Sequence, residues 1–150
     1  MSRIKMLLAL GFAMISFAGA QQASAQTVCS NQAFQGLYGF SATGWSVTTA
    51  GTFPTAAAGN FLFDGQGGIT TTLTLSANGQ VLPSVVSSGT YTLNSDCTGT
   101  ITFSVAVGDQ SIPFTLNLFV DDNNKEFRAI STTQGTVLTL EGRKQFTTTP

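Results

Sequence analysis

The chain has 150 residues, a formal net charge of −1 and no histidine, and only 9% of its residues are charged, against roughly 25% in ordinary domains. This composition offers no electrostatic surface for nucleic acid, so no nucleic-acid partner is predicted. The absence of histidine excludes Ser-His-Asp and Cys-His catalysis and imidazole metal sites, so no catalytic residue is assigned and enzyme activity is left open.

The first 25 residues predict a secretory signal peptide. Arg3 and Lys5 precede an apolar run over residues 6–17, which is too short to span a membrane, and small residues follow it. Two A-x-A cleavage sites compete, at residues 18–20 and 23–25, and we favour the second, which leaves residues 26–150 as a single domain. No later segment is long enough for stable membrane insertion, so we expect a secreted or periplasmic protein.

Beyond the signal peptide, apolar and polar side chains alternate with the two-residue period of half-buried strands. Turn residues such as Asn78-Gly79 and Gly108-Asp109 separate these runs. Hairpin-linked strands in this number predict an all-β fold, an eight-stranded antiparallel up-and-down β-barrel, with a β-sandwich as the alternative. The predicted strands are residues 34–42, 56–64, 68–76, 85–94, 99–107, 111–120, 126–132 and 136–144.

The alternation also predicts which side chains face solvent. Glu126 and Arg128 on one strand, and Glu141 and Arg143 on the next, are each spaced by two and are expected to form cross-strand ion pairs. Their apolar strand neighbours favour the outside of the barrel, and the alternative is an inward-facing, desolvated set that would be a candidate for function. The threonines expected on the outer face are Thr70, Thr72, Thr74, Thr90, Thr92, Thr100 and Thr102.

Cys29 and Cys97, the only cysteines, are predicted to form a disulfide. In an up-and-down barrel, the start of the first strand and the turns after the second, fourth and sixth strands lie at one end. Both cysteines fall at that end, and cysteines of an exported protein are expected to pair. The bridge would hold the N-terminal segment across this opening as a cover.

The opposite end carries apolar residues in its connections. A long connection over residues 43–54 contains Trp45 and Phe53, and a connection over residues 81–83 contains Leu82. Large apolar side chains at a barrel mouth indicate an entrance for a ligand. Alternatively, Trp45 and Phe53 fold inward and close the mouth. The predicted ligand-binding residues are Trp45, Phe53 and Leu82 at the mouth, with Phe103 and Phe114 inside the barrel.

Two polar motifs are explained by turn chemistry alone. The glycine-rich run at residues 65–68 opens a strand instead of a helix and lacks a following lysine, so it is not a phosphate loop. Residues 121–124 lack the glycine and the spaced carboxylate of a calcium-binding loop. No metal site and no cofactor are predicted.

The strings GLYGF, FDGQGG, SSGTYTLNSDCTGT and GTVLTLEGRKQ, together with the N-terminal cysteine, are similar to those of a group of small exported bacterial proteins. The resemblance covers essentially the mature chain. It implies a barrel like that of the allene oxide cyclases, which are relatives of the lipocalin-like calycins. The plant cyclase uses a carboxylate inside an apolar cavity, and no residue of this chain matches it, so the resemblance implies a fold and no catalytic residue.

Three hypotheses about function follow. The first is an exported barrel that binds a small apolar ligand in its interior. The second is a cyclase or isomerase acting in the same cavity through its shape and a lone carboxylate. The third is a barrel filled by its own side chains, with a structural role in the envelope or matrix. An eight-stranded barrel is wide enough to be filled or to hold one small ligand, so its strand number does not decide among them.

Overall fold

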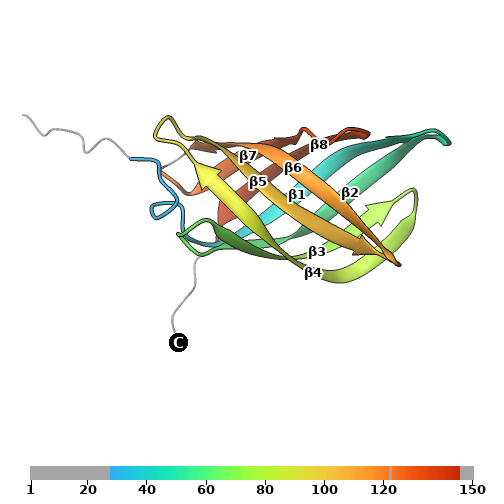
Figure 1. Cartoon of the computed structure of the whole chain (residues 1–150), viewed down its shortest axis with the longest axis horizontal. Helices are drawn as coiled ribbons and strands as arrows, with labels where there is room; N and C mark the ends of the chain where they lie inside the picture. The colour runs from blue at the N-terminus through green and yellow to red at the C-terminus, as the bar shows by residue number, and fades with distance from the viewer. Residues whose placement is uncertain (1–27, 122, 146–150) are drawn as a thin grey trace, which may run out of the picture.

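The computed structural model describes residues 28–121 and 123–145, so the predicted signal peptide and cleavage site lie outside the described part. One antiparallel sheet closes on itself, because β8 pairs with β1 as well as with β7 (Figure 1). The up-and-down barrel is therefore confirmed, and the β-sandwich is excluded. The strands are β1 (Gly36–Thr48), β2 (Gly51–Phe63), β3 (Gly68–Ala77), β4 (Gln80–Leu93), β5 (Thr98–Val107), β6 (Gln110–Asp121), β7 (Glu126–Ser131) and β8 (Thr136–Lys144).

No helix with the length and apolar character of a membrane span occurs among residues 28–121 and 123–145.

Side chains alternate between the interior of the barrel and solvent, as the sequence pattern predicts. On β3, Ile69 and Leu73 are buried while Thr70 and Thr72 are exposed. The other predicted outer threonines are also exposed, except Thr100, which is half-buried. Thr71 belongs to the inner face and is fully buried, and its hydroxyl donates to the carbonyl oxygen of Asn60 at 2.8 Å. A buried hydroxyl is tolerated here because it has a partner.

The predicted long connection over residues 43–54 is wrong. β1 and β2 continue through it and pair up to Thr48 and Gly51, so that only two residues remain in the turn. Pro54 lies within β2, yet its carbonyl oxygen accepts from the backbone N–H of Asn78, in the turn just beyond the end of β3. The N–H and C=O of one residue in an extended strand point to the same side, so the N–H that Pro54 lacks would face this turn, beyond the end of β3. No ladder hydrogen bond to β1 or β3 is lost, which explains how a proline fits into this strand.

The predicted connection over residues 81–83 is also part of a strand. The turn between β3 and β4 is Asn78-Gly79. Both residues have a positive φ, 50° and 78°, as a two-residue type I′ hairpin turn requires. β4 begins directly after it and contains a β-bulge, where the register shifts between Leu73 and Leu75 and Ser84 adopts a φ of 53°. The extra residue reverses the alternation, so that Leu82 lies on the inner face.

One end of the barrel, the closed end, is filled by aromatic rings. Phe34 was expected in the first strand, but it precedes β1 and is fully buried inside the barrel. Its ring centroid lies 4.5 Å from that of Tyr38 and 4.7 Å from that of Phe63. Gly142 faces Phe127 across the β7–β8 pair, and a Cβ at that glycine would lie 2.2 Å from the phenylalanine ring. The glycine therefore makes room for the ring.

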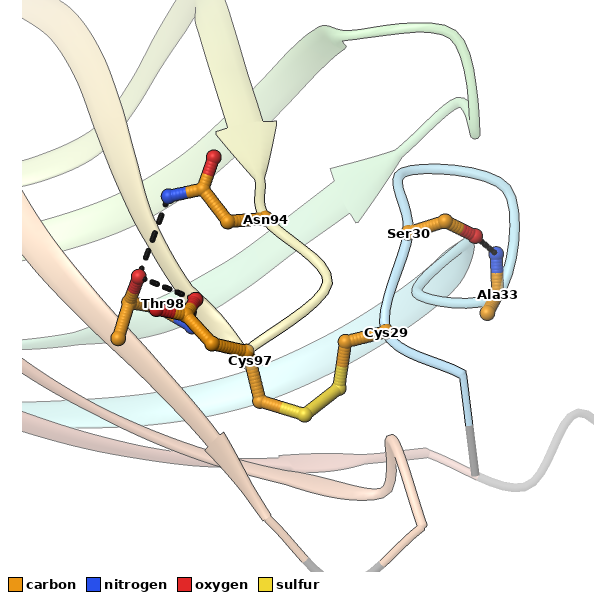
Figure 2. Close-up of a disulfide and its surroundings, with 7 residues drawn as sticks. Cys29, Ser30, Ala33, Asn94, Cys97 and Thr98 are labelled. Atoms are coloured by element: carbon orange, nitrogen blue, oxygen red, sulfur yellow. Dashed lines mark hydrogen bonds between the residues drawn. A yellow bond between two sulfur atoms is a disulfide. The ribbon is translucent and has the colours of Figure 1, made fainter. Parts of the chain in front are cut away.

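The disulfide between Cys29 and Cys97 is present, with 5.1 Å between the two Cα atoms (Figure 2). Cys97 ends the β4–β5 turn with a φ of 66°, and its backbone N–H donates to the carbonyl oxygen of Asn94. Cys29 starts the N-terminal segment, which lies at the same end of the barrel as this turn (Figure 1). The predicted shared end and the predicted cover are both confirmed.

Asn31 secures the cover to the barrel by hydrogen bonds. Its side-chain oxygen accepts from the backbone N–H of Leu93 at 2.7 Å, and its carbonyl oxygen accepts from the Tyr91 hydroxyl at 2.9 Å. The Tyr91 oxygen in turn accepts from the backbone N–H of Gly65 in the β2–β3 turn. The covalent bridge, the Phe34 ring and these bonds hold the N-terminal segment in one position.

We expect the Cys29→Ser/Cys97→Ser double variant to remain a barrel but to lose unfolding free energy. The bridge spans 68 residues of sequence, and closing such a loop is worth about 4 kcal/mol in the chain-entropy model. Urea unfolding followed by circular dichroism measures the change. A free-thiol assay on the unfolded, unreduced wild-type protein should find none, and two reactive thiols would contradict the bridge.

Thr71 and Thr72 form a matched pair for testing the two faces of the sheet. Thr72→Lys should change the unfolding free energy by less than about 0.5 kcal/mol, because the new charge stays in water. Thr71→Lys should cost about 3 kcal/mol or more, because it buries an unpaired charge among apolar side chains. Equal losses in the two variants would show that the faces are assigned wrongly.

Candidate functional site

The opposite end, the open end, contains a recess of about 400 Å³ inside the barrel. It lies inside the end of the barrel that the β1–β2, β3–β4, β5–β6 and β7–β8 turns surround. This end is on the right in Figure 1. Seven of the strands contribute to its wall, all but the short β7, so the recess is the mouth of the barrel lumen. The lining residues are Ser46, Thr55, Leu75, Ala77, Gln80, Leu82, Val107, Ile112, Phe114 and Thr136.

The floor of the recess is aromatic and apolar. Phe114 stacks on Phe103, with ring centroids 5.6 Å apart and ring planes 19° from parallel. A small cavity of about 40 Å³ continues beneath, and Thr55, Leu75 and Phe114 line both spaces. Below that cavity, Phe61 stacks on Phe40, and the aromatic cluster of the closed end begins. The interior is therefore filled in one half and hollow in the other.

The structure brings together three of the five predicted ligand-binding residues. Leu82 and Phe114 line the recess, and Phe103 lies in its floor. Phe53 lies on the inner face of β2 near the turn and is half-buried, but it is not one of the lining residues. Trp45 is not part of the group, because it lies on the outer face of β1 and is 50% exposed.

Trp45 lies outside because the strand alternation continues where a loop was expected. It pairs across the sheet with Pro54 on β2 and Val137 on β8, and both of these neighbours are also exposed. The predicted position of Trp45 in a connection at the mouth is therefore wrong. Neither of the two alternatives for this residue, a side chain at the entrance or a side chain folded inward, describes its place on the outer wall.

A pair of hydroxyls in the recess was missed by the sequence analysis. Ser46 on β1 and Thr55 on β2 are hydrogen-bonded to each other, with 2.9 Å between Oγ and Oγ1. A third hydroxyl, that of Thr136, donates to the carbonyl oxygen of Thr133 and lies 2.6 Å from the Ser131 hydroxyl. The sequence signal for Ser46 was its spacing, because Ala42, Gly44 and Ser46 are two residues apart and therefore lie on the same face of a strand.

No charged side chain of the described residues lines the recess, and most of them lie toward the closed end. Arg143 and Glu126 form the predicted cross-strand pair on the outer face. Arg128 was expected to pair across the β7–β8 strands, but it contacts Asp121 on β6 at 2.9 Å. Glu126, Arg128 and Arg143 line a second depression, of about 650 Å³, on the outer wall between β1, β7 and β8. Exposed and mutually paired charges of this kind are typical of a solvated surface.

The titratable groups with shifted pKa values all lie at the closed end. Burial raises the pKa of the Tyr38 hydroxyl well above its ordinary value, and this hydroxyl donates to the carbonyl oxygen of Asn124. Burial also raises the pKa of Tyr91. Hydrogen bonds from the backbone of Gln66 and its neighbours lower the pKa of Asp64, and those from Thr98 lower the pKa of Asp96. Packing and turn geometry account for all four shifts.

The described residues contain no group of three or more acidic or cysteine side chains arranged to hold a metal ion. A comparison with protein-family models, with characterised proteins and with solved structures found no match for the chain.

The raised pKa values predict a loss of stability in alkali. In the unfolded chain both tyrosines ionise near the ordinary pKa of 10.0, while burial in the barrel raises the pKa values of Tyr38 and Tyr91, so that both ionise at higher pH in the folded state. Above pH 10 the unfolded state therefore binds fewer protons, and the unfolding free energy falls as the pH rises.

Urea unfolding between pH 8 and 11 measures this effect, and Tyr38→Phe should make the alkaline slope shallower than that of the wild type. The comparison of slopes removes every contribution that the two proteins share. Tyrosinate absorbance that appears over the same pH range in the folded and in the unfolded protein would contradict the prediction.

Proposed function

We propose that the protein is an exported small β-barrel that binds a small apolar molecule in the recess at the open end. The observation that carries the proposal is the unequal filling of one lumen. Phe34 and the rings around it fill the closed half, whereas Phe103 and Phe114 form a floor with a hollow above it. A volume of about 400 Å³ falls within the roughly 300–1,000 Å³ of small-molecule pockets.

The chemistry of the wall supports an apolar ligand. Aliphatic and aromatic side chains such as Leu75, Leu82 and Phe114 make up most of the lining, and hydroxyls supply a few polar points. Pockets for small molecules commonly combine a mainly apolar lining with a few placed polar groups. Burial of such a ligand is favourable by about 25 cal/mol for each Å² of apolar surface removed from water.

Export is supported by features at the N-terminal side of the chain. Structural disulfides persist in oxidising compartments, and the Cys29–Cys97 bridge fixes the cover of the closed end. The predicted signal peptide at residues 1–25 accounts for how the chain would reach such a compartment.

An isomerase or cyclase in the same recess has less support. That mechanism needs a carboxylate beside the substrate, and the recess-lining side chains among the described residues are neutral. A purely structural barrel, the third hypothesis, would leave the hollow without a role. Binding is therefore the function that the recess supports best.

The proposal predicts saturable binding of a neutral apolar fluorophore, N-phenyl-1-naphthylamine, with enhanced emission. Leu82→Asp should weaken this binding about tenfold or more, because it places a carboxylate in the wall of the recess. Val81→Asp is the matched control, since the neighbouring Val81 side chain lies on the outer face and is 59% exposed. Absence of saturable binding, or an equal loss in the two variants, would contradict the proposal.

A further inference from the structure

We infer that the recess takes an uncharged ligand, an apolar chain or ring system carrying one oxygen atom that accepts a hydrogen bond, and that it disfavours the carboxylate of the same chain. The inference rests on the proposed function, because it names the class of ligand for the same recess. Two observations carry it: the hydroxyl pair in the wall and the distribution of charge over the barrel.

The hydroxyl pair has a hydrogen left to donate. A hydroxyl carries one hydrogen and two acceptor lone pairs. Ser46 and Thr55 lie 2.9 Å apart, so one of them donates to the other, and the hydrogen of the accepting hydroxyl is not used within the pair. These two side chains make no other hydrogen bond with the described part of the chain. Both line the recess, so the remaining hydrogen can be donated to a ligand oxygen there.

The other hydroxyl in the wall is already engaged. Thr136 donates to the carbonyl oxygen of Thr133, and its oxygen lies within hydrogen-bond distance of Ser131. Polar recognition is therefore concentrated on the β1–β2 side of the recess. A ligand with a single oxygen would place it against Ser46 and Thr55 and extend its apolar part toward Phe114 and Leu82.

The charged side chains of the described residues are concentrated toward the closed end of the barrel. Of the charged residues that the structure describes, only Asp109 lies in a turn of the open end, two residues from Val107 in the recess wall. The others lie in the closed-end turns or on the parts of β6, β7 and β8 that lead toward them. No arginine or lysine is among the residues that line the recess.

This arrangement discriminates between an alcohol or ketone and a carboxylate. A neutral oxygen accepts the free hydroxyl hydrogen at little desolvation cost. A carboxylate in the same place gives up its hydration, gains no cation, and has the negative charge of Asp109 at the rim. Apolar anions, including the fatty acids that barrels of this size could hold, are thereby disfavoured relative to neutral molecules of the same length.

The test compares 1-octanol, 2-octanone and octanoate at pH 8 as competitors of N-phenyl-1-naphthylamine on the disulfide-bonded protein. The alcohol and the ketone should displace the fluorophore about tenfold more tightly than octanoate, or better. Replacing both hydroxyls, in Ser46→Ala/Thr55→Val, should weaken octanol about 2- to 10-fold, as expected for one lost hydrogen bond. The loss for octanol should exceed the loss for the fluorophore, which has no oxygen to accept this hydrogen bond, and equal losses would show that only the shape of the recess has changed.

Gln80→Lys tests whether adding a cation to the recess makes it bind a carboxylate. Gln80 lines the recess and is exposed, so a lysine there supplies the missing cation without entering the apolar floor. This variant should raise the affinity for octanoate relative to that for octanol about tenfold over the wild type.

The outcomes separate the inference from the proposed function. Octanoate binding the wild type as tightly as octanol would overturn the inference and leave the binding function in place. The inference would also be overturned if the fluorophore bound but neither octanol nor octanone displaced it. No saturable binding of the fluorophore or of any octyl compound would overturn both.

Discussion

Phe34 enters the barrel from the N-terminal side, and its ring lies 4.5 to 6.5 Å, centroid to centroid, from those of Tyr38, Phe63, Tyr91 and Phe127. An eight-stranded barrel encloses a lumen that side chains must fill or a ligand must occupy. The strands alone would leave the closed end open, and Phe34, which precedes β1, fills it. The disulfide keeps that residue in place, because it ties the preceding segment to the β4–β5 turn.

The two halves of the lumen differ in the side chains that face it. Aromatic rings around Phe34 fill one half. Near the opposite turns, the small residues Ser46, Thr55 and Ala77 stand at lumen-facing positions among larger apolar side chains. Small and hydroxylated residues there leave space above the Phe103–Phe114 stack. Under the proposed function, the half closed by Phe34 and the disulfide keeps the core packed, and the ligand occupies the hollow half.

The sequence predicted the closed barrel, the strand order, the disulfide and the outward threonines, because all of these follow from a period of two and from turn residues. It failed where a strand continues through residues that usually break one. Pro54 and Pro83 lie in the two stretches, residues 43–54 and 81–83, that were predicted to be connections. Pro54 sits where no partner strand needs its N–H, and Pro83 sits beside a bulge. Such tolerance depends on the neighbouring strand, which a single sequence does not reveal.

The candidate site was predicted in part for the same reason. Leu82 was chosen as an exposed loop residue and reaches the recess because the bulge at Ser84 reverses the alternation of β4. Trp45 was chosen on the same grounds, but uninterrupted alternation carries it to the outer wall. One inserted residue thus decides whether a large apolar side chain lies inside or outside the barrel. Strand register, more than residue type, decides which side chains face the lumen at the open end. The Ser46–Thr55 hydroxyl pair is formed by two ordinary polar residues, so it can be identified only when the register of β1 and β2 is known.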